Sequence, residues 1–93
     1  MSMINTETMT MGDMFGYMMA SRGVTSNSTT VEVVQALVDT TRQAAENVAD
    51  MAKSLIHDFC AGYSDEYMEC LTENEGEYVS NATGEVVSVP MIP

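Results

Sequence analysis

The spacing of apolar residues between positions 31 and 59 constrains the fold of this chain more than any other feature of its sequence. Steps of three and four residues place side chains on one face of a helix, and their strict alternation gives a heptad seam. Eight of the nine positions are apolar: Val31, Val34, Val38, Thr41, Ala45, Val48, Ala52, Leu55 and Phe59. The pattern predicts one long helix over residues 29–60, with a small-residue middle that another helix can approach closely.

Signals for both ends of this helix flank the pattern. Thr29 and Glu32 have the spacing of a capping box, and Gly62 follows the last apolar position. At ~1.5 Å per residue the helix would be about 45 Å long, which is long for a small chain. The alternative is a kink at Asp39-Thr40-Thr41, where β-branched residues weaken the helix, giving an antiparallel pair. We favour the continuous helix.

A Met-rich segment comes before the long helix and predicts a helix over residues 8–21, with Gly23 as its stop, after a flexible N-terminus at residues 1–7. Its apolar side chains share one helix face: Met11, Met14, Phe15, Met18 and Met19. Gly12 and Gly16 each cost up to about 1 kcal/mol relative to Ala, so this helix needs packing to be stable. The Met stripe has two interpretations: part of the core, which is usual for an apolar stripe, or an adaptable surface for a partner.

The last third of the sequence predicts a short helix and a β-hairpin. Ser64 has the position of an N-cap before acidic residues, which predicts a short acidic helix over residues 64–73. Two β-branched segments predict a hairpin over residues 77–89, with Gly84 in the left-handed conformation of the turn. A two-stranded hairpin is marginal alone, so it must lean on the helices or pair with another chain.

These elements predict a mainly α fold, α+β only in a small sense, in a single domain over residues 1–93. Fourteen Asp and Glu residues against three Lys and Arg give a formal charge of −11, on a chain that is 45% hydrophobic. This charge argues against direct binding of nucleic acid or of an anionic membrane surface. The sequence has neither a signal peptide nor a stretch of ~20 apolar residues, so a cytoplasmic location is expected, in the host cytoplasm if the chain is viral.

The chain offers little for catalysis or metal binding. It has one His, one Lys and two Cys, and neither a Gly-rich phosphate loop nor a Gly-x-Ser-x-Gly motif, so we expect neither an enzyme nor a cofactor. His57 and Cys60 lie one helical turn apart, and with Cys70 and Asp65 or Glu66 they form the best candidate zinc site. Free cysteines are usually buried beside apolar faces, which is where both cysteines fall, so no metal site is expected.

Acidic residues gather in the last third without any Lys or Arg among them. Between positions 58 and 85 they are Asp58, Asp65, Glu66, Glu69, Glu73, Glu75, Glu77 and Glu85. On the predicted short helix, Glu66, Glu69 and Glu73 would form a row with Cβ atoms ~5–6 Å apart, similar to the spacing of nucleic-acid phosphates. The simpler interpretation is a solvated face that keeps the protein soluble.

The favoured hypothesis is a small acidic inhibitor that presents this carboxylate row to the basic surface of a nucleic-acid-binding protein. In size and charge the chain resembles the small acidic proteins, DNA mimics included, with which bacteriophages disarm host restriction, CRISPR or polymerase machinery. That resemblance is one of composition and transfers no residues. The expected partner-binding residues are Asp65, Glu66, Glu69, Glu73, Glu75 and Glu77.

The alternative hypothesis is a self-assembling helical adaptor or virion-type structural protein that uses the heptad seam. Its expected oligomer interface is Val34, Val38, Ala45, Val48, Ala52, Leu55 and Phe59. A chain of this size has few other residues to cover a four-heptad seam, so we expect a homodimer under either hypothesis.

Overall fold

The computed structural model describes residues 10–92 of the chain. It is mainly helical with one small antiparallel sheet, as predicted. In chain order the elements are α1 (Met11–Ala20), α2 (Thr30–Gln43), α3 (Glu46–Asp58), a π-helical turn (Phe59–Tyr63), α4 (Ser64–Met68), β1 (Glu77–Val79) and β2 (Val86–Ser88). The predicted flexible segment at residues 1–7 lies outside the described residues, as do the first two positions of the predicted helix 8–21.

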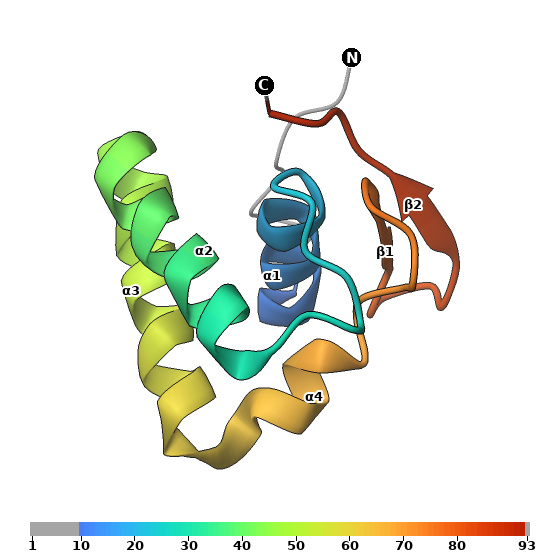
Figure 1. Ribbon diagram of the computed structural model, residues 1–93, viewed down its shortest axis with the longest axis horizontal. Helices are drawn as coiled ribbons and strands as arrows, with labels where there is room; N and C mark the ends of the chain where they lie inside the picture. The colour runs from blue at the N-terminus through green and yellow to red at the C-terminus, as the bar shows by residue number, and fades with distance from the viewer. Residues whose placement is uncertain (1–9, 93) are drawn as a thin grey trace.

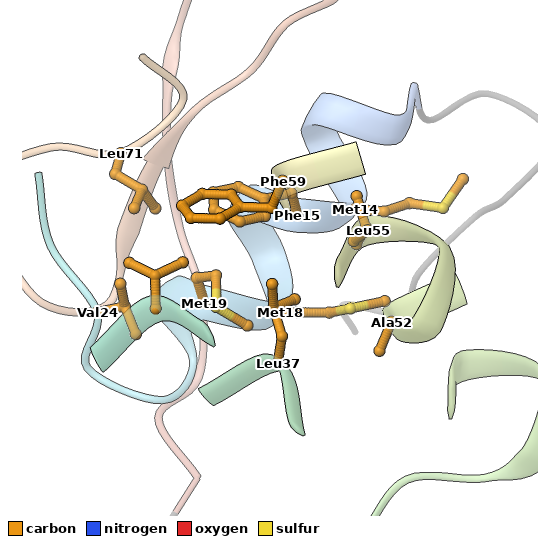
Figure 2. Packing of buried hydrophobic residues seen from close by; sticks show 11 residues of the cluster. Met14, Phe15, Met18, Met19, Val24, Leu37, Ala52, Leu55, Phe59 and Leu71 are labelled. Atoms are coloured by element: carbon orange, nitrogen blue, oxygen red, sulfur yellow. The ribbon is translucent and has the colours of Figure 1, made fainter. Parts of the chain in front are cut away.

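The Met-rich helix α1 forms the centre of the molecule. The pair of α2 and α3 lies on one side of it and the hairpin on the other (Figure 1). Met14, Phe15, Met18 and Met19 are buried among residues of α2, α3, the π-helical turn and the adjoining loops (Figure 2), and the hairpin packs with Ala20 in a second cluster. Seven of the ten residues of α1 are buried, so the Met stripe belongs to the core.

Both ends of α1 are closed by local hydrogen bonds. At the N-terminus Thr10 and Asp13 form a capping box. At the other end Gly23 has a φ of +80°, the left-handed conformation predicted for a helix stop. The N–H groups of Gly23 and Val24 donate to the carbonyls of Ala20 and Met19, which is the pattern of a Schellman motif.

Residues 29–60 form two helices, so the prediction of one continuous helix is wrong. Ala44 and Ala45 are both extended, with ψ values of 165° and 158°, and the chain folds back there, not at the alternative site Asp39-Thr40-Thr41. The resulting helices lie side by side (Figure 1). The longest dimension over the described residues is 27 Å, whereas the continuous helix would need about 45 Å. Folding back buries a face of each helix, and this outweighs the helix propensity of two alanines.

The buried stripe of α2 is also shifted from the predicted seam. Val33, Leu37 and Thr40 are fully buried, whereas Val34 and Val38 are half-buried and Val31 is 77% exposed. On α3 the predicted positions Ala52 and Leu55 are buried, as is Phe59 at the start of the π-helical turn. A break of two extended residues removes the helical phase relation between the two halves, so each half has its own buried face.

Aromatic rings join α1 to the C-terminal end of α3 and to α4. The rings of Phe15 and Phe59 stack with centroids 6.1 Å apart, and the ring of Tyr67 lies 5.2 Å from that of Phe15. Gly62, with a φ of +108°, turns the chain between α3 and α4, at the helix stop that the sequence predicts.

The short acidic helix ends at Met68, so its predicted extent of 64–73 is too long. Cys70 and Leu71 leave the helix to contact β1: the Val79 N–H donates to the Cys70 carbonyl (2.7 Å), and Leu71 forms a bridge with Tyr78. Ser64 is the first residue of α4 and no side chain caps this helix, so the predicted Ser64 cap is wrong.

The C-terminal hairpin forms where the sequence predicts it. β1 and β2 are antiparallel, with Glu77, Tyr78 and Val79 opposite Ser88, Val87 and Val86. Gly84 has a φ of +76°, as expected for the turn. The hairpin leans on α1, because the side chain of Tyr78 packs directly over Gly16. A Cβ at Gly16 would lie 2.6 Å from Tyr78 Cδ2, so a glycine is needed for this contact.

Candidate functional site

An open groove of about 640 Å³ runs between the N-terminal end of α1, α4 and the hairpin turn. Two of the predicted partner-binding residues, Glu66 and Glu69, line it from α4 and its C-terminal cap. Thr10 and Asn81 line it from α1 and the hairpin. Elements far apart in the sequence therefore converge on one acidic depression.

Tyr67 sets the orientation of α4 beside this groove. Its ring packs on Phe15, and its hydroxyl donates to Asp58 Oδ2 (2.9 Å). Burial, followed by this hydrogen bond and the negative charge of Asp58, raises the pKa of Tyr67 to about 12. Because Tyr67 is held on the inner side of the helix, its neighbours Glu66 and Glu69 are left exposed.

A buried carboxylate holds the opposite wall of the groove in place. The side chain of Asp13 accepts hydrogen bonds from the Asn81 N–H at Oδ1 and from the Thr10 N–H at Oδ2. Asn81 Nδ2 also donates to Thr10 Oγ1 (3.2 Å). These bonds tie the hairpin turn to the first turn of α1. This anchor was not predicted from the sequence, although Thr10 followed by an acidic residue three positions later is the signal of a capping box.

Cys70 forms part of the groove but is not poised for chemistry. It is buried, and its Sγ lies close to Gly12, where a Cβ would be only 3.2 Å away. Burial, with the charges of Asp13 and Glu69, raises the pKa of the Cys70 thiol. The neutral thiol is a poor nucleophile and a poor metal ligand at neutral pH.

The candidate zinc residues do not converge. Cys60 and Cys70 are both free thiols, and Cys60 is exposed at the surface. Within the part of the chain that the structure describes, no group of three or more His, Cys, Asp and Glu side chains is arranged to hold a metal ion.

The six predicted partner-binding acids do not form one row. Asp65, Glu66 and Glu69 belong to α4 and its cap, whereas Glu73 and Glu75 lie in the following loop and Glu77 begins β1. The predicted row of Glu66, Glu69 and Glu73 on one helix face is therefore wrong, because the helix ends before Glu73. All six are exposed except Glu77, which is half-buried and whose Oε1 accepts hydrogen bonds from Thr72 Oγ1 (3.3 Å) and Asn74 Nδ2 (3.2 Å).

These carboxylates have no cationic partner among residues 10–92. Over that range the ion pairs are Lys53 with Asp50 (3.9 Å) and His57 with Asp58 (3.8 Å), and neither involves the six acids. The segment from position 58 to position 85 contains no Lys or Arg. Its negative charge is thus compensated only by solvent and counterions.

The predicted oligomer interface is largely inside the molecule. Ala52, Leu55 and Phe59 lie in the core, where they cannot contact a second copy of the folded chain. Val34 and Val48 pack partly against the same core, and Val38 is half-buried. Ala45 is exposed, in the turn between α2 and α3.

Across the described residues, no helix is both long enough and apolar enough to cross a membrane. Comparison of the chain with protein-family models, with curated proteins and with solved structures finds no match.

Proposed function

We propose that this protein is a small acidic inhibitor that binds the basic surface of a nucleic-acid-binding protein and blocks access of nucleic acid to it. The observation that carries the proposal is the set of carboxylates from Asp65 to Glu77, all exposed except the half-buried Glu77. This set has no Lys or Arg partner among the described residues. An uncompensated charge of this kind attracts a positive surface and raises its association rate.

The geometry changes how such an inhibitor would act. Only Glu66 and Glu69 keep the three-residue helical spacing, and both border a groove. The remaining acids follow in a loop, so the partner would meet a broad negative field around a depression, not a straight row at the pitch of phosphates. The negative field attracts a basic partner, and the groove favours one whose contact surface is convex.

The proposed place of action is the cytoplasm, of a host cell if the chain is viral, where free thiols such as Cys60 and Cys70 are usual. Self-assembly through the heptad seam receives less support, because burial of Ala52, Leu55 and Phe59 within one chain accounts for most of the apolar pattern.

The test is a binding titration of the full chain against a panel of basic nucleic-acid-binding proteins at increasing NaCl, with duplex DNA as competitor. We expect affinity to fall steeply with salt and DNA to be displaced. The combined Glu66→Gln, Glu69→Gln and Glu73→Gln variant should bind on the order of tenfold more weakly.

The matched control carries Glu46→Gln and Asp50→Asn, which remove charge from exposed positions of α3. This control should bind almost as tightly as the natural chain. Binding that is indifferent to salt, or an equal loss in both variants, would show that the carboxylates around α4 are not the contact surface.

A further inference from the structure

Among residues 10–92, one edge of the hairpin has no partner strand. The Ser80 N–H donates to the Glu85 carbonyl and the Val89 N–H donates to the Gly76 carbonyl, both at 2.8 Å. Hydrogen-bonded and non-hydrogen-bonded pairs alternate along an antiparallel ladder, so Val87 bonds to its partner in β1. It follows that the N–H and C=O groups of Val86 and Ser88 point away from β1.

The opposite edge of the hairpin is occupied. The Val79 N–H donates to the Cys70 carbonyl, and Leu71 bridges to Tyr78. β1 therefore lies between this segment and β2, whereas β2 is the outer strand on the side away from α1 (Figure 1). Of the two edges, that of β2 is the one available for pairing.

The side chains at this edge combine an apolar and an acidic feature. Val86 is 57% exposed, which is unusual for a strand valine. Ser88 is also exposed, and its partner in the register is Glu77 on the same face of the sheet. Because Ser88 is short, a long side chain on an added strand can pass over it toward the Glu77 carboxylate on β1, which lies two strand spacings, or about 9.6 Å, away.

We infer that an extended segment of a basic partner adds as an antiparallel strand to the edge of β2, with an apolar residue opposite Val86 and a Lys or Arg opposite Ser88. The inference deepens the proposed function, on which it rests, by naming the form in which the basic partner binds. Strand addition supplies main-chain hydrogen bonds for affinity, and the alternating side chains supply specificity.

Charge selects a basic segment over a second copy of this chain. Each copy has a formal charge of −11, so two copies repel each other. A Lys or Arg opposite Ser88 can instead extend across β2 toward the Glu77 carboxylate.

The first test uses the isotope-labelled full chain and the peptide acetyl-TKTVTKT-amide as probe, followed by amide hydrogen exchange in NMR. The peptide carries Lys and Val on one strand face. We expect the amides of Val86 and Ser88 to gain protection of on the order of tenfold, whereas that of Val87 changes little because it is already bonded. Shifts confined to the residues of the α4 groove would overturn the inference.

Two methylated peptides separate strand pairing from simple charge attraction without altering the protein. N-methylation of the Lys and Val residues removes the N–H groups that face β2 and should abolish protection. N-methylation of the Thr residues leaves those groups and should preserve it. Equal binding of both peptides would contradict strand addition.

Variants of the protein test the same inference from the other side of the proposed interface. Ser88→Pro removes an outward N–H but no bond to β1, so the hairpin remains while peptide affinity falls at least about tenfold. Glu77→Gln should weaken the Lys peptide but not a version in which Met replaces both Lys. If Ser88→Pro does not fold, the methylated peptides decide the question on the natural chain.

The outcomes also separate this inference from the proposed function. One outcome is that a basic protein binds in a salt-sensitive way that requires Glu66 and Glu69 and is unaffected by Ser88→Pro. That result would support the proposed function and refute strand addition. Protection of Val86 and Ser88 that rises with protein concentration, in the absence of peptide, would refute it in favour of self-pairing.

Discussion

At the scale of single residues, Gly16 and Asp13 determine how the hairpin attaches to α1. Gly16 leaves the space into which the side chain of Tyr78 packs, and Asp13 receives the backbone N–H of Asn81. Gly16 is unfavourable inside a helix, where Gly costs about 1 kcal/mol relative to Ala, so its presence is explained by the tertiary contact. Asp13 serves both the capping box of α1 and the contact with the hairpin.

Gly16→Ala is expected to destabilise the protein although Ala is the better helix former. The new Cβ would lie 2.6 to 2.9 Å from three atoms of Tyr78, so the hairpin must move. We expect the free energy of unfolding in urea to fall by about 1–3 kcal/mol. Gly12→Ala is the control. Its new Cβ would come closest to Cys70 Sγ, at 3.2 Å, so the loss of unfolding free energy should be smaller. A more stable Gly16→Ala protein would contradict this account.

The raised pKa of Tyr67 leads us to expect a loss of folding stability at alkaline pH. Its pKa is raised to about 12 by burial and by Asp58, compared with about 10 in an unfolded chain. The folded state therefore holds the phenolic proton more tightly, and this contribution is complete below pH ~10 and lost as the pH rises toward ~12. Urea unfolding across this range should show the decline. Tyr67→Phe should make the decline shallower, and Asp58→Asn should make it smaller and end it at a lower pH, because the folded pKa of Tyr67 then rises less.

At the scale of the elements, the turn between α2 and α3 is the feature that shapes the fold. Ala44 and Ala45 have no side chain that caps either helix, and the residues that compete with the helix backbone come earlier. Thr40 Oγ1 donates to the Ala36 carbonyl (2.9 Å), and Thr41 Oγ1 donates to the Val38 carbonyl (2.6 Å). The turn is thus imposed by packing of the two helices on α1.

Ala45→Pro distinguishes this turn from a continuous helix. Ala45 has a φ of −60° and follows an extended residue, which suits proline, so the variant should gain about 0.4–1 kcal/mol in unfolding free energy. In a continuous helix the same change would cost about 3 kcal/mol. Ala44→Pro is the matched control and should destabilise, because the Ala44 N–H donates to the Thr40 carbonyl (3.0 Å). Thermal unfolding of both variants shows whether each one is more or less stable than the natural chain.

Local signals in the sequence were sufficient for some elements and not for others. The capping box of Thr29 and Glu32, the stops at Gly23 and Gly62, and the turn at Gly84 depend on nearby residues, and all were predicted correctly. The break at Ala44-Ala45 and the early end of α4 depend on distant partners, so periodicity alone could not place them. The same limit applies to the site: its acidic residues were evident in the sequence, but the groove requires α1, α4 and the hairpin together.

At the scale of the whole molecule, charge opposes compactness. A formal charge of −11 is confined within dimensions of 27 × 26 × 26 Å, so many carboxylates lie within a few Debye lengths of each other. The core formed around α1 must offset this repulsion, which counterions screen only in part.

Added salt is therefore expected to stabilise the folded chain. Between about 0.02 M and about 0.5 M NaCl the Debye length falls from roughly 20 Å to roughly 4 Å, and the melting temperature should rise. The combined Glu66→Gln, Glu69→Gln and Glu73→Gln variant should melt higher at low salt and respond less to added salt. Calorimetry of both proteins over this range provides the measurement, and a flat response of the natural chain would refute the expectation.

The central position of α1 has a consequence for biosynthesis. Its Met-rich surface is made early by the ribosome, whereas Phe59, Leu71 and Tyr78, which cover it, are translated much later. α2 and α3 can pair during translation, but α1 stays without its full cover until the hairpin has emerged. The nascent chain thus exposes an apolar, methionine-rich segment to which chaperones can bind, and completion of the fold is expected only after the last strand leaves the exit tunnel.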